Sequence, residues 1–434
     1  MMAAMAMDLR ALTRAARTEL DAFTRRHGSC RAELFLAVSH RLSLEYEART
    51  RVSSLSEGES RVAAARVWEG ERSGFAALPV EQPVGLANVL EVAWARLGPG
   101  GGGAHGPVGH AEREACLPEL SAERARGLAE HISRTVVPPG FVVQAEVLTQ
   151  VAAWSALLGS EGGCQEALST REEAFVRCET ARGAVVDAVA SPLGEGWDLE
   201  ALRRRLAEAV EALEGPAEAV DPGLPLVLRP AVAAPLVAAL GWLLRGDVAV
   251  ATPALARAVG RKPFPSVLSV EDAPLHPLGA QRRSTDDEGL PMRPLRLIEE
   301  GRLVGFLHSV ATAARLGVEP NGRGLRGELS PPMPSATNLF IVPRGDALPE
   351  RYTELVARVE TFTTMARPGT VSLVAGGWEV QGGRRVRRIA PVDLSLPVLE
   401  TFRALQAVGG DLTFFPSAEG CGTPTLVFPA LLAG

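Results

Sequence analysis

The sequence predicts an α+β protein, with an N-terminal antiparallel sheet and helices followed by a C-terminal curled, barrel-like β-sheet with a few helices. Three features predict this class. Alternating apolar and polar residues, which are typical of half-buried strands, recur in both halves of the chain. Helical periodicity is limited to a few segments. Hairpin signals with glycine at the turn follow one another closely in the second half.

In the N-terminal half, five segments carry readable patterns. Residues 9–23 place leucine and phenylalanine at helical spacing among charged residues, which predicts an amphipathic helix. Residues 42–48 alternate like a strand, and residues 66–78 predict two strands joined at a Glu-Gly turn. Residues 87–98 have helical periodicity. Residues 141–189 contain several short strand-like pieces, so we expect an antiparallel sheet there.

The middle of the chain predicts a helix and then a boundary. Residues 198–213 form the strongest helical pattern, with Asp198 as the N-cap and leucine and valine on one stripe. The next twelve residues, "EGPAEAVDPGLP", are rich in turn formers. We therefore expect two domains, residues 1–222 and 223–434, which agrees with a length too great for one ordinary domain.

The C-terminal half predicts two hairpins. Residues 295–309 read as two strands with Glu300-Gly301 at the turn, followed by a short helix. Residues 372–389 read as a second hairpin that turns near Gly382-Gly383. The basic run "RRVRR" within this hairpin is expected to be a solvated strand or a partner contact.

Composition argues against several classes of protein. A formal charge of -6 does not suit a nucleic-acid binder, which needs concentrated positive charge. The five cysteines are odd in number and far apart, so we expect neither a disulfide framework nor a structural zinc cluster. The longest apolar run, residues 231–244, is shorter than the roughly 20 residues that a membrane span requires. We find no signal-peptide pattern and expect a cytoplasmic protein without membrane partners.

The stretch "STDDEGLP", residues 284–291, sets three consecutive acids against a glycine. Adjacent acids on an extended chain point to opposite faces, and the nearest histidine is His276. An aspartate carboxylate can bond nearby backbone N–H groups, and glycine adopts positive φ, so such a run is a good turn signal. We therefore interpret the run as a turn rather than as an acid/base or metal site.

Residues 284–317 and the segment "SPPMPSATNLFIVPRG" (330–345) resemble the signature region of the TldD/PmbA (TldE) family. In that region an acid–acid–glycine turn leads into a hairpin, then a helix ending in Arg-Leu-Gly, then a proline-rich strand with Thr-Asn-Leu. Residues 32–77 and 382–405 also look like family segments. The resemblance therefore covers nearly the whole chain.

What the resemblance implies depends on one helix. Peptide-cutting members of the TldD type carry His-Glu-x-x-x-His there, and a later cysteine completes a zinc site whose bound water loses a proton to the Glu. In this chain the matching positions are Ala238, Ala239 and Leu243, and no histidine lies between Pro225 and Val270. None of these three side chains can bind metal or move a proton.

The resemblance thus implies a non-catalytic PmbA (TldE)-like subunit that pairs with a zinc-bearing TldD-like subunit. The heterodimer would accept unfolded peptides for leader removal or degradation, with zinc in the partner and no cofactor in this chain. Candidate residues of the substrate cleft, all in or beside the signature region, are Asp287, Glu288, Gly289, His308 and Asn338. Cys421 lies near the position of the metal-bearing subunit's cysteine, and is either a vestigial ligand position or an inert thiol.

Two other functions stay open. The chain could be a metal-free homodimeric protein that binds peptides or acts as a scaffold, which the size of the isolated chain would reveal. It could also be a thiol enzyme that uses Cys421 with His308 or His276. That chemistry needs a base within hydrogen-bond reach of an activated thiol, which the sequence does not show.

Overall fold

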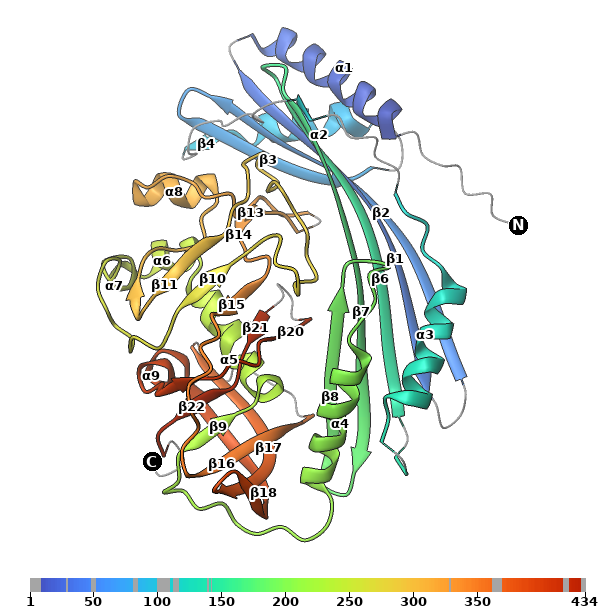
Figure 1. Cartoon of the computed structure of the whole chain (residues 1–434). Coiled ribbons are helices and arrows are strands. Elements are labelled where there is room, and N and C mark those ends of the chain that lie inside the picture. The colour runs from blue at the N-terminus through green and yellow to red at the C-terminus, as the bar shows by residue number, and fades with distance from the viewer. Residues whose placement is uncertain are drawn as a thin grey trace.

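The computed structural model describes residues 9–28, 30–47, 52–80, 85–99, 110–111, 117–138, 140–141, 143–327, 329–360, 369–416 and 421–430. It has two parts, which Figure 1 shows side by side. The N-terminal part contains the elements from α1 to β8 together with α4, and the C-terminal part contains the elements from β9 onward.

Long antiparallel strands form the N-terminal part. At the centre, β1 (Arg31–Glu47) lies between β2 (Val52–Glu69) and β6 (Val143–Gly159). The sheet continues outward through β3 (Arg72–Pro79), β4 (Gly98–Pro99), β7 (Cys164–Thr180), β8 (Gly183–Ser191) and the short β5 (His110–Ala111). The expected strands over 42–48 and 66–78 are confirmed as parts of β1 and of the β2–β3 hairpin.

The antiparallel sheet expected over residues 141–189 is confirmed, but its strands are longer than the short pieces that the sequence indicates. The segment forms three strands, of which β6 and β7 are each 17 residues long. Two turns separate these strands, one at Gly162 and one at Gly183, and φ is positive at both glycines. In β7, alternate side chains from Glu172 to Cys178 are buried, and β6 and β7 keep one register except for a shift between Val143 and Ala145.

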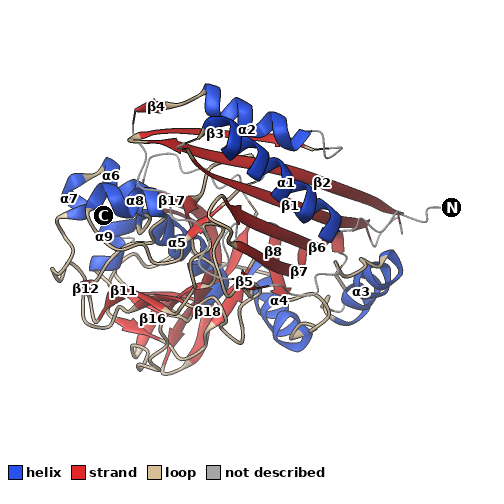
Figure 2. Ribbon diagram, turned by 90° about the horizontal axis from the view of Figure 1, so that it is seen from above, coloured by secondary structure: helices blue, strands red, loops and turns tan. Residues whose placement is uncertain are grey.

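Four helices cover one face of this sheet: α1 (Leu9–His27), α2 (Gly85–Ala95), α3 (Ala122–Thr135) and α4 (Leu199–Leu213). Leu20 and Phe23 of α1 pack with the even-numbered residues of β1, such as Leu34, in one buried cluster. Figure 2 shows α1 lying across the long strands. The predicted N-cap is confirmed, because Asp198 accepts a hydrogen bond of 2.9 Å from the backbone N–H of Ala201. Among the described helices, these four cover the face that holds the even-numbered residues of β1, and the odd-numbered residues of β1 lie on the other face.

The C-terminal part extends the same sheet and adds a second one. Strands β9 (Leu226–Leu228), β16 (Arg351–Val359), β17 (Thr370–Gln381), β18 (Arg384–Pro397), β19 (Ala407–Val408) and β22 (Leu426–Phe428) join the long sheet through pairing of β16 with β8. The hairpin turn at Gly382-Gly383 is confirmed. One sheet contains strands from both sides of residues 214–225, and the domain boundary placed there stays a prediction.

The second sheet has six strands in the order β12 (Arg302–Leu303), β11 (Leu295–Glu299), β10 (Val270–Asp272), β15 (Leu339–Ile341), β21 (Cys421–Thr423) and β20 (Thr413–Phe415). A small pair, β13 (Gly324–Leu325) and β14 (Met333–Pro334), lies apart from it. The helices are α5 (Pro230–Leu243), α6 (Gly246–Ala251), α7 (Pro253–Ala256), α8 (Val310–Leu316) and α9 (Val398–Arg403). The sheets curl, but the described strands form no closed barrel.

The apolar run at residues 231–244 forms α5 and its C-cap, and its role is to fill the C-terminal core. Val232, Leu236 and Leu240 are fully buried in a cluster that includes residues of both sheets. Burial on nearly all sides explains why the run has no polar stripe. Among the residues described, none of the helices combines the length and apolarity that crossing a membrane requires.

The basic run in β18 is paired within the chain. Arg385 contacts Glu354, Arg387 contacts Glu379, and the guanidinium of Arg388 lies 4.5 Å from the ring centroid of Trp378. Three of the four arginines of the run thus have partners within the chain.

Candidate functional site

The positions that match the zinc motif lie on the second half of α5. Ala238, Ala239 and Leu243 are partly buried and pack against the C-terminal core. Methyl and isobutyl groups have no lone pair for a metal, so this helix does not fit zinc. In the described part of the chain, no group of three or more histidine, cysteine or acidic side chains is arranged to hold a metal ion.

Cys421 of β21 lies directly against this helix. Its Sγ donates to the carbonyl oxygen of Ala234 at 3.6 Å, and the residue is only 2% exposed. Ala234 precedes Ala238 by one helical turn, on the same face of α5. Cys421 is far in sequence from the motif positions on α5, and the fold brings it next to them. It lies there as a buried thiol beside alanine side chains.

The acid run forms the turn that the sequence predicts. Oδ1 of Asp286 accepts hydrogen bonds from the backbone N–H groups of Glu288 at 3.0 Å and Leu290 at 2.8 Å. Its Oδ2 accepts another from the N–H of Gly324 at 2.9 Å. Gly289 has a φ of 83°, which favours glycine. The turn is thus held by one carboxylate and one residue without a Cβ.

Asp286 has a strongly raised pKa. It is 5% exposed, and burial together with the neighbouring charge of Glu288 raises its pKa to about 7. The three backbone donors lower the pKa, but they do not offset these two effects. The side chain therefore titrates near neutral pH while buried in a structural turn.

The other two acids of the turn bind different parts of the chain. Asp287 accepts a hydrogen bond from the backbone N–H of Arg326 at 2.8 Å and is paired with Arg283. Glu288 accepts from the N–H of Val310 at 2.7 Å through Oε2. Its Oε1 accepts from Nη1 of Arg66, on strand β2 of the N-terminal part, at 2.8 Å. Glu288 therefore joins segments 222 residues apart.

Four charged side chains make up this junction, and we call Glu33, Arg66, Glu288 and Arg326 the junction cluster. Oε1 of Glu33 accepts from Nε of Arg66 at 2.5 Å and from Nη2 of Arg326 at 2.7 Å. The guanidinium of Arg326 also lies 4.7 Å from the ring centroid of Phe35. Burial alone would lower the pKa of Arg66, but Glu33 and Glu288 outweigh it, so the guanidinium stays charged. The acid run thus ties the C-terminal part to the long sheet.

His308 lies beside this turn, and Asn338 does not. His308 is 5% exposed, burial lowers its pKa, and its Nδ1 is 3.3 Å from Oγ1 of Thr312. Its carbonyl accepts from the N–H of Arg323 at 3.3 Å. Asn338 donates to the carbonyls of Ala273 and Gln281 at 3.0 and 2.8 Å. Both side chains bond within the chain, and their role as cleft residues stays a prediction.

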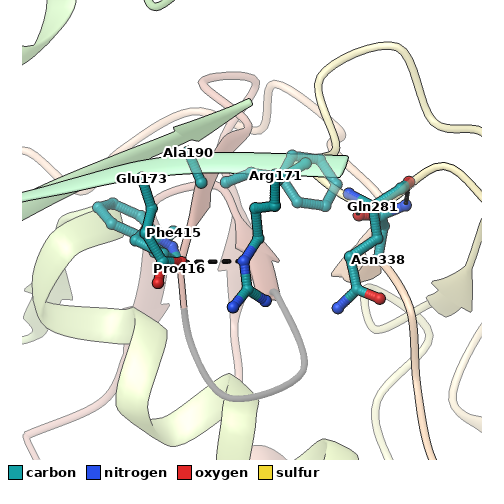
Figure 3. A pocket seen from close by; sticks show the side chains of 9 residues that line it. Arg171, Glu173, Ala190, Gln281, Asn338, Phe415 and Pro416 are labelled. Atoms are coloured by element: carbon teal, nitrogen blue, oxygen red, sulfur yellow. Dashed lines mark hydrogen bonds and ion pairs between the residues drawn. The ribbon is translucent and has the colours of Figure 1, made fainter. Parts of the chain in front are cut away.

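A hollow lies next to Asn338, where the two parts meet. It is lined by residues of β7, β8, β20 and the loop before the acid run, and Figure 3 shows it from close by: Arg171, Glu173, Ala190, Ala280, Gln281, Asn338, Phe414, Phe415 and Pro416. Sequence reasoning missed all of these except Asn338. No local signal could have found them, because the lining segments come together only when β20 packs beside β8.

His276, named as a base for a thiol enzyme, is held in an aromatic stack near this hollow. Its ring centroid lies 4.8 Å from the centroids of both Phe340 and Phe414, and burial lowers its pKa. These contacts give it a packing role in the second sheet.

Comparison with known proteins places the chain among metallopeptidase relatives. Residues 223–433 match the family model of the PmbA/TldA metallopeptidase C-terminal domain. A protein of Synechocystis sp. named a metalloprotease is 28% identical over 207 residues, which are 46% of this chain and 44% of that protein. Another metalloprotease, from Methanothermobacter thermautotrophicus, is 24% identical over 314 residues, or 68% of each chain. The first alignment thus spans less than half of that relative.

Solved structures share the fold along the whole chain. A Thermotoga maritima protein described as a modulator of DNA gyrase superposes with a TM-score of 0.79 at 19% identity, covering 96% of this chain and 99% of its own. TldE from Thermococcus kodakarensis superposes with a TM-score of 0.78 at 20% identity, covering 95% and 98%. At these identities the similarity establishes the fold.

Proposed function

Because this chain belongs to the TldD/PmbA family, we propose that it is a non-catalytic, TldE/PmbA-like subunit of a TldD/TldE-type heterodimeric zinc metalloprotease. One observation carries the proposal. The helix that would hold zinc in a catalytic member offers Ala238, Ala239 and Leu243, all packed against the core. Zinc and the general base must then come from a partner subunit.

In this proposal the chain builds one wall of a space for unfolded peptides. The six-stranded sheet ends at β20, which pairs only with β21 among the described strands. An edge strand offers unpaired N–H and C=O groups, and an extended peptide can add to it by backbone hydrogen bonds that do not depend on sequence. Such binding suits leader removal or the degradation of small proteins.

The junction cluster gives this wall a defined shape. Glu288 and Arg326 are almost fully buried between β1, β2 and the turn before β11, so the two parts of the chain are held by charge pairs as well as by the shared sheet. A peptide between them would meet a preorganised surface. The chain would also stabilise the metal-bearing partner by presenting this surface to it.

Co-expression with a zinc-bearing relative that carries His-Glu-x-x-x-His tests the proposal. We expect a 1:1 complex that hydrolyses unfolded peptides and loses activity when zinc is chelated, while this chain alone is inactive. Recovery of the chain only as a homodimer, with no binding to such a relative, would instead favour a metal-free peptide-binding or scaffold protein. The thiol alternative finds no support in the structure, because Cys421 is 2% exposed.

A further inference from the structure

The side chain of Arg171, on β7, forms an ion pair but no hydrogen bond within the described residues. Its Nε lies 3.2 Å from Oε2 of Glu173, but the buried N–H does not point at that oxygen and donates no hydrogen bond. Within the described residues, the two terminal nitrogens have no hydrogen-bond acceptor either. A guanidinium carries five N–H donors. The N–H groups that Arg171 presents to the hollow thus have no acceptor among the described residues.

Two arginines of the helices that cover the opposite face of β7 and β8 bind carboxylates differently. Arg124 donates to both carboxylate oxygens of Glu172, and Arg205 donates to both oxygens of Asp187. These two-bond pairs are the geometry that arginine and carboxylate prefer. Glu173, one residue along from Glu172, forms no such pair with Arg171. Arg171 thus lacks the two-bond carboxylate pair that Arg124 and Arg205 each have.

The walls of the hollow favour a charged acceptor. Figure 3 shows the guanidinium reaching between Glu173 and Pro416 on one side and Gln281 and Asn338 on the other. Phe415, Pro416 and Ala190 contribute apolar surface, which strengthens electrostatic interactions next to it. The amide of Asn338 is already bonded to Ala273 and Gln281, so it does not compete for the ligand. Arg171 is 32% exposed and can still be reached from solvent.

We propose that Arg171 binds a carboxylate of the peptide substrate through Nη1 and Nη2, while Glu173 holds the Nε side of the guanidinium. The inference rests on the proposed function, since it assigns a substrate group to that same space. A planar carboxylate offers two oxygens at the spacing of the guanidinium fork, whereas a single peptide carbonyl satisfies only one donor. The carboxylate belongs either to the C-terminus of the peptide or to an aspartate or glutamate side chain.

A peptide-binding assay on the purified full-length chain tests this assignment. The probes are fluorescein-labelled, unstructured heptapeptides of alanine, serine and leucine, made as the C-terminal acid and as the C-terminal amide. A second pair of amidated pools carries either glutamate or glutamine at each internal position. We expect at least about tenfold tighter binding of one carboxylate form over its neutral counterpart, because charge-assisted pairs are the strong ones. The pair that shows the difference identifies the source of the carboxylate.

Arg171→Gln should abolish this preference without weakening the neutral peptides, and Arg171→Lys should restore only part of it, since lysine is a point charge. The matched control is Arg41→Gln. Arg41 is exposed on the same face of the sheet, opposite Val151, which in turn lies opposite Arg171. This variant makes the same charge change two strands away and should keep the full preference.

Equal binding of the acid and neutral forms, or a preference that survives Arg171→Gln, overturns the assignment and leaves the proposed function standing. A preference lost equally in Arg41→Gln would show general electrostatics and also overturn it. Binding to none of the peptides contradicts the assignment as well. The proposed function fails separately, when no 1:1 complex forms with a zinc-bearing relative.

Discussion

Glu288→Gln provides the sharpest test of the junction cluster. The Glu288 side chain is fully buried and makes two hydrogen bonds, to Nη1 of Arg66 at 2.8 Å and to the N–H of Val310 at 2.7 Å. Both of these partners are donors. A glutamine has one oxygen, so its NH₂ group must face one of the two donors, and Arg66 keeps only Glu33 as a negatively charged partner in the cluster.

The expected cost follows from these contacts. Hydrogen bonds to a charged group contribute about 1.5–3 kcal/mol each, and removing one partner of a buried ion pair costs about 3–5 kcal/mol. We therefore expect Glu288→Gln to lower the free energy of unfolding by about 3–5 kcal/mol. The control is Glu69→Gln on β2, whose pair with Arg72 is exposed. That change should cost less than about 1 kcal/mol.

Urea unfolding, followed by circular dichroism and by intrinsic fluorescence, measures both variants. Two probes are needed because a chain of this size can unfold in more than one step. A double-mutant cycle of Arg66→Met with Glu288→Gln should show a coupling of at least about 1 kcal/mol. Equal effects of Glu288→Gln and Glu69→Gln, or a coupling near zero, would refute the reasoning that the cluster holds the two parts together.

Three further predictions concern single residues. Because the pKa of Asp286 is raised from 3.8 to about 7, the native state keeps a proton that the unfolded state has lost, so stability falls as pH rises from about 4 to 7. The unfolding free energy of the wild type relative to Asp286→Asn should drop by about 4 kcal/mol over this range in urea titrations, and a constant difference contradicts the assignment. A Cβ at Gly324 would overlap the carboxylate of Glu288, whereas one at Gly305 meets nothing within 4 Å, so Gly324→Ala should be destabilising by at least about 2 kcal/mol and Gly305→Ala by less than about 1. Similar melting temperatures for the two would count against the packing described. Iodoacetamide should modify half-buried Cys164 well before Cys421 in the native protein, as read by mass spectrometry, and rapid labelling of Cys421 would reopen the thiol hypothesis.

Local patterns predicted those parts of the fold that local chemistry determines. The helix after Asp198 was predictable because its cap and its apolar stripe lie within sixteen residues. The acid run was predictable as a turn because an aspartate and a glycine with positive φ are sufficient to form it. The lengths of β6 and β7 could not be predicted, because pairing with neighbouring strands extends a strand beyond the residues that alternate clearly between apolar and polar.

The candidate site shows the same limit. The loss of the zinc ligands on α5 could be predicted, because the resemblance placed the zinc motif on one helix of this chain. Alanine and leucine cannot bind a metal ion in any fold. That Glu288 would bond Arg66, or that Arg171 would meet residues of β20, depends on contacts between segments more than 200 residues apart. No periodicity or motif encodes such contacts, and only the folded chain brings the residues together.

The zinc content and peptidase activity of the chain, purified first alone and then with a His-Glu-x-x-x-His relative, test the central claim most directly. We predict no stoichiometric zinc and no hydrolysis of an unfolded peptide by the chain alone, and one zinc per heterodimer with chelator-sensitive hydrolysis for the pair. One tightly bound zinc in the isolated chain together with cleavage of the peptide would contradict the account.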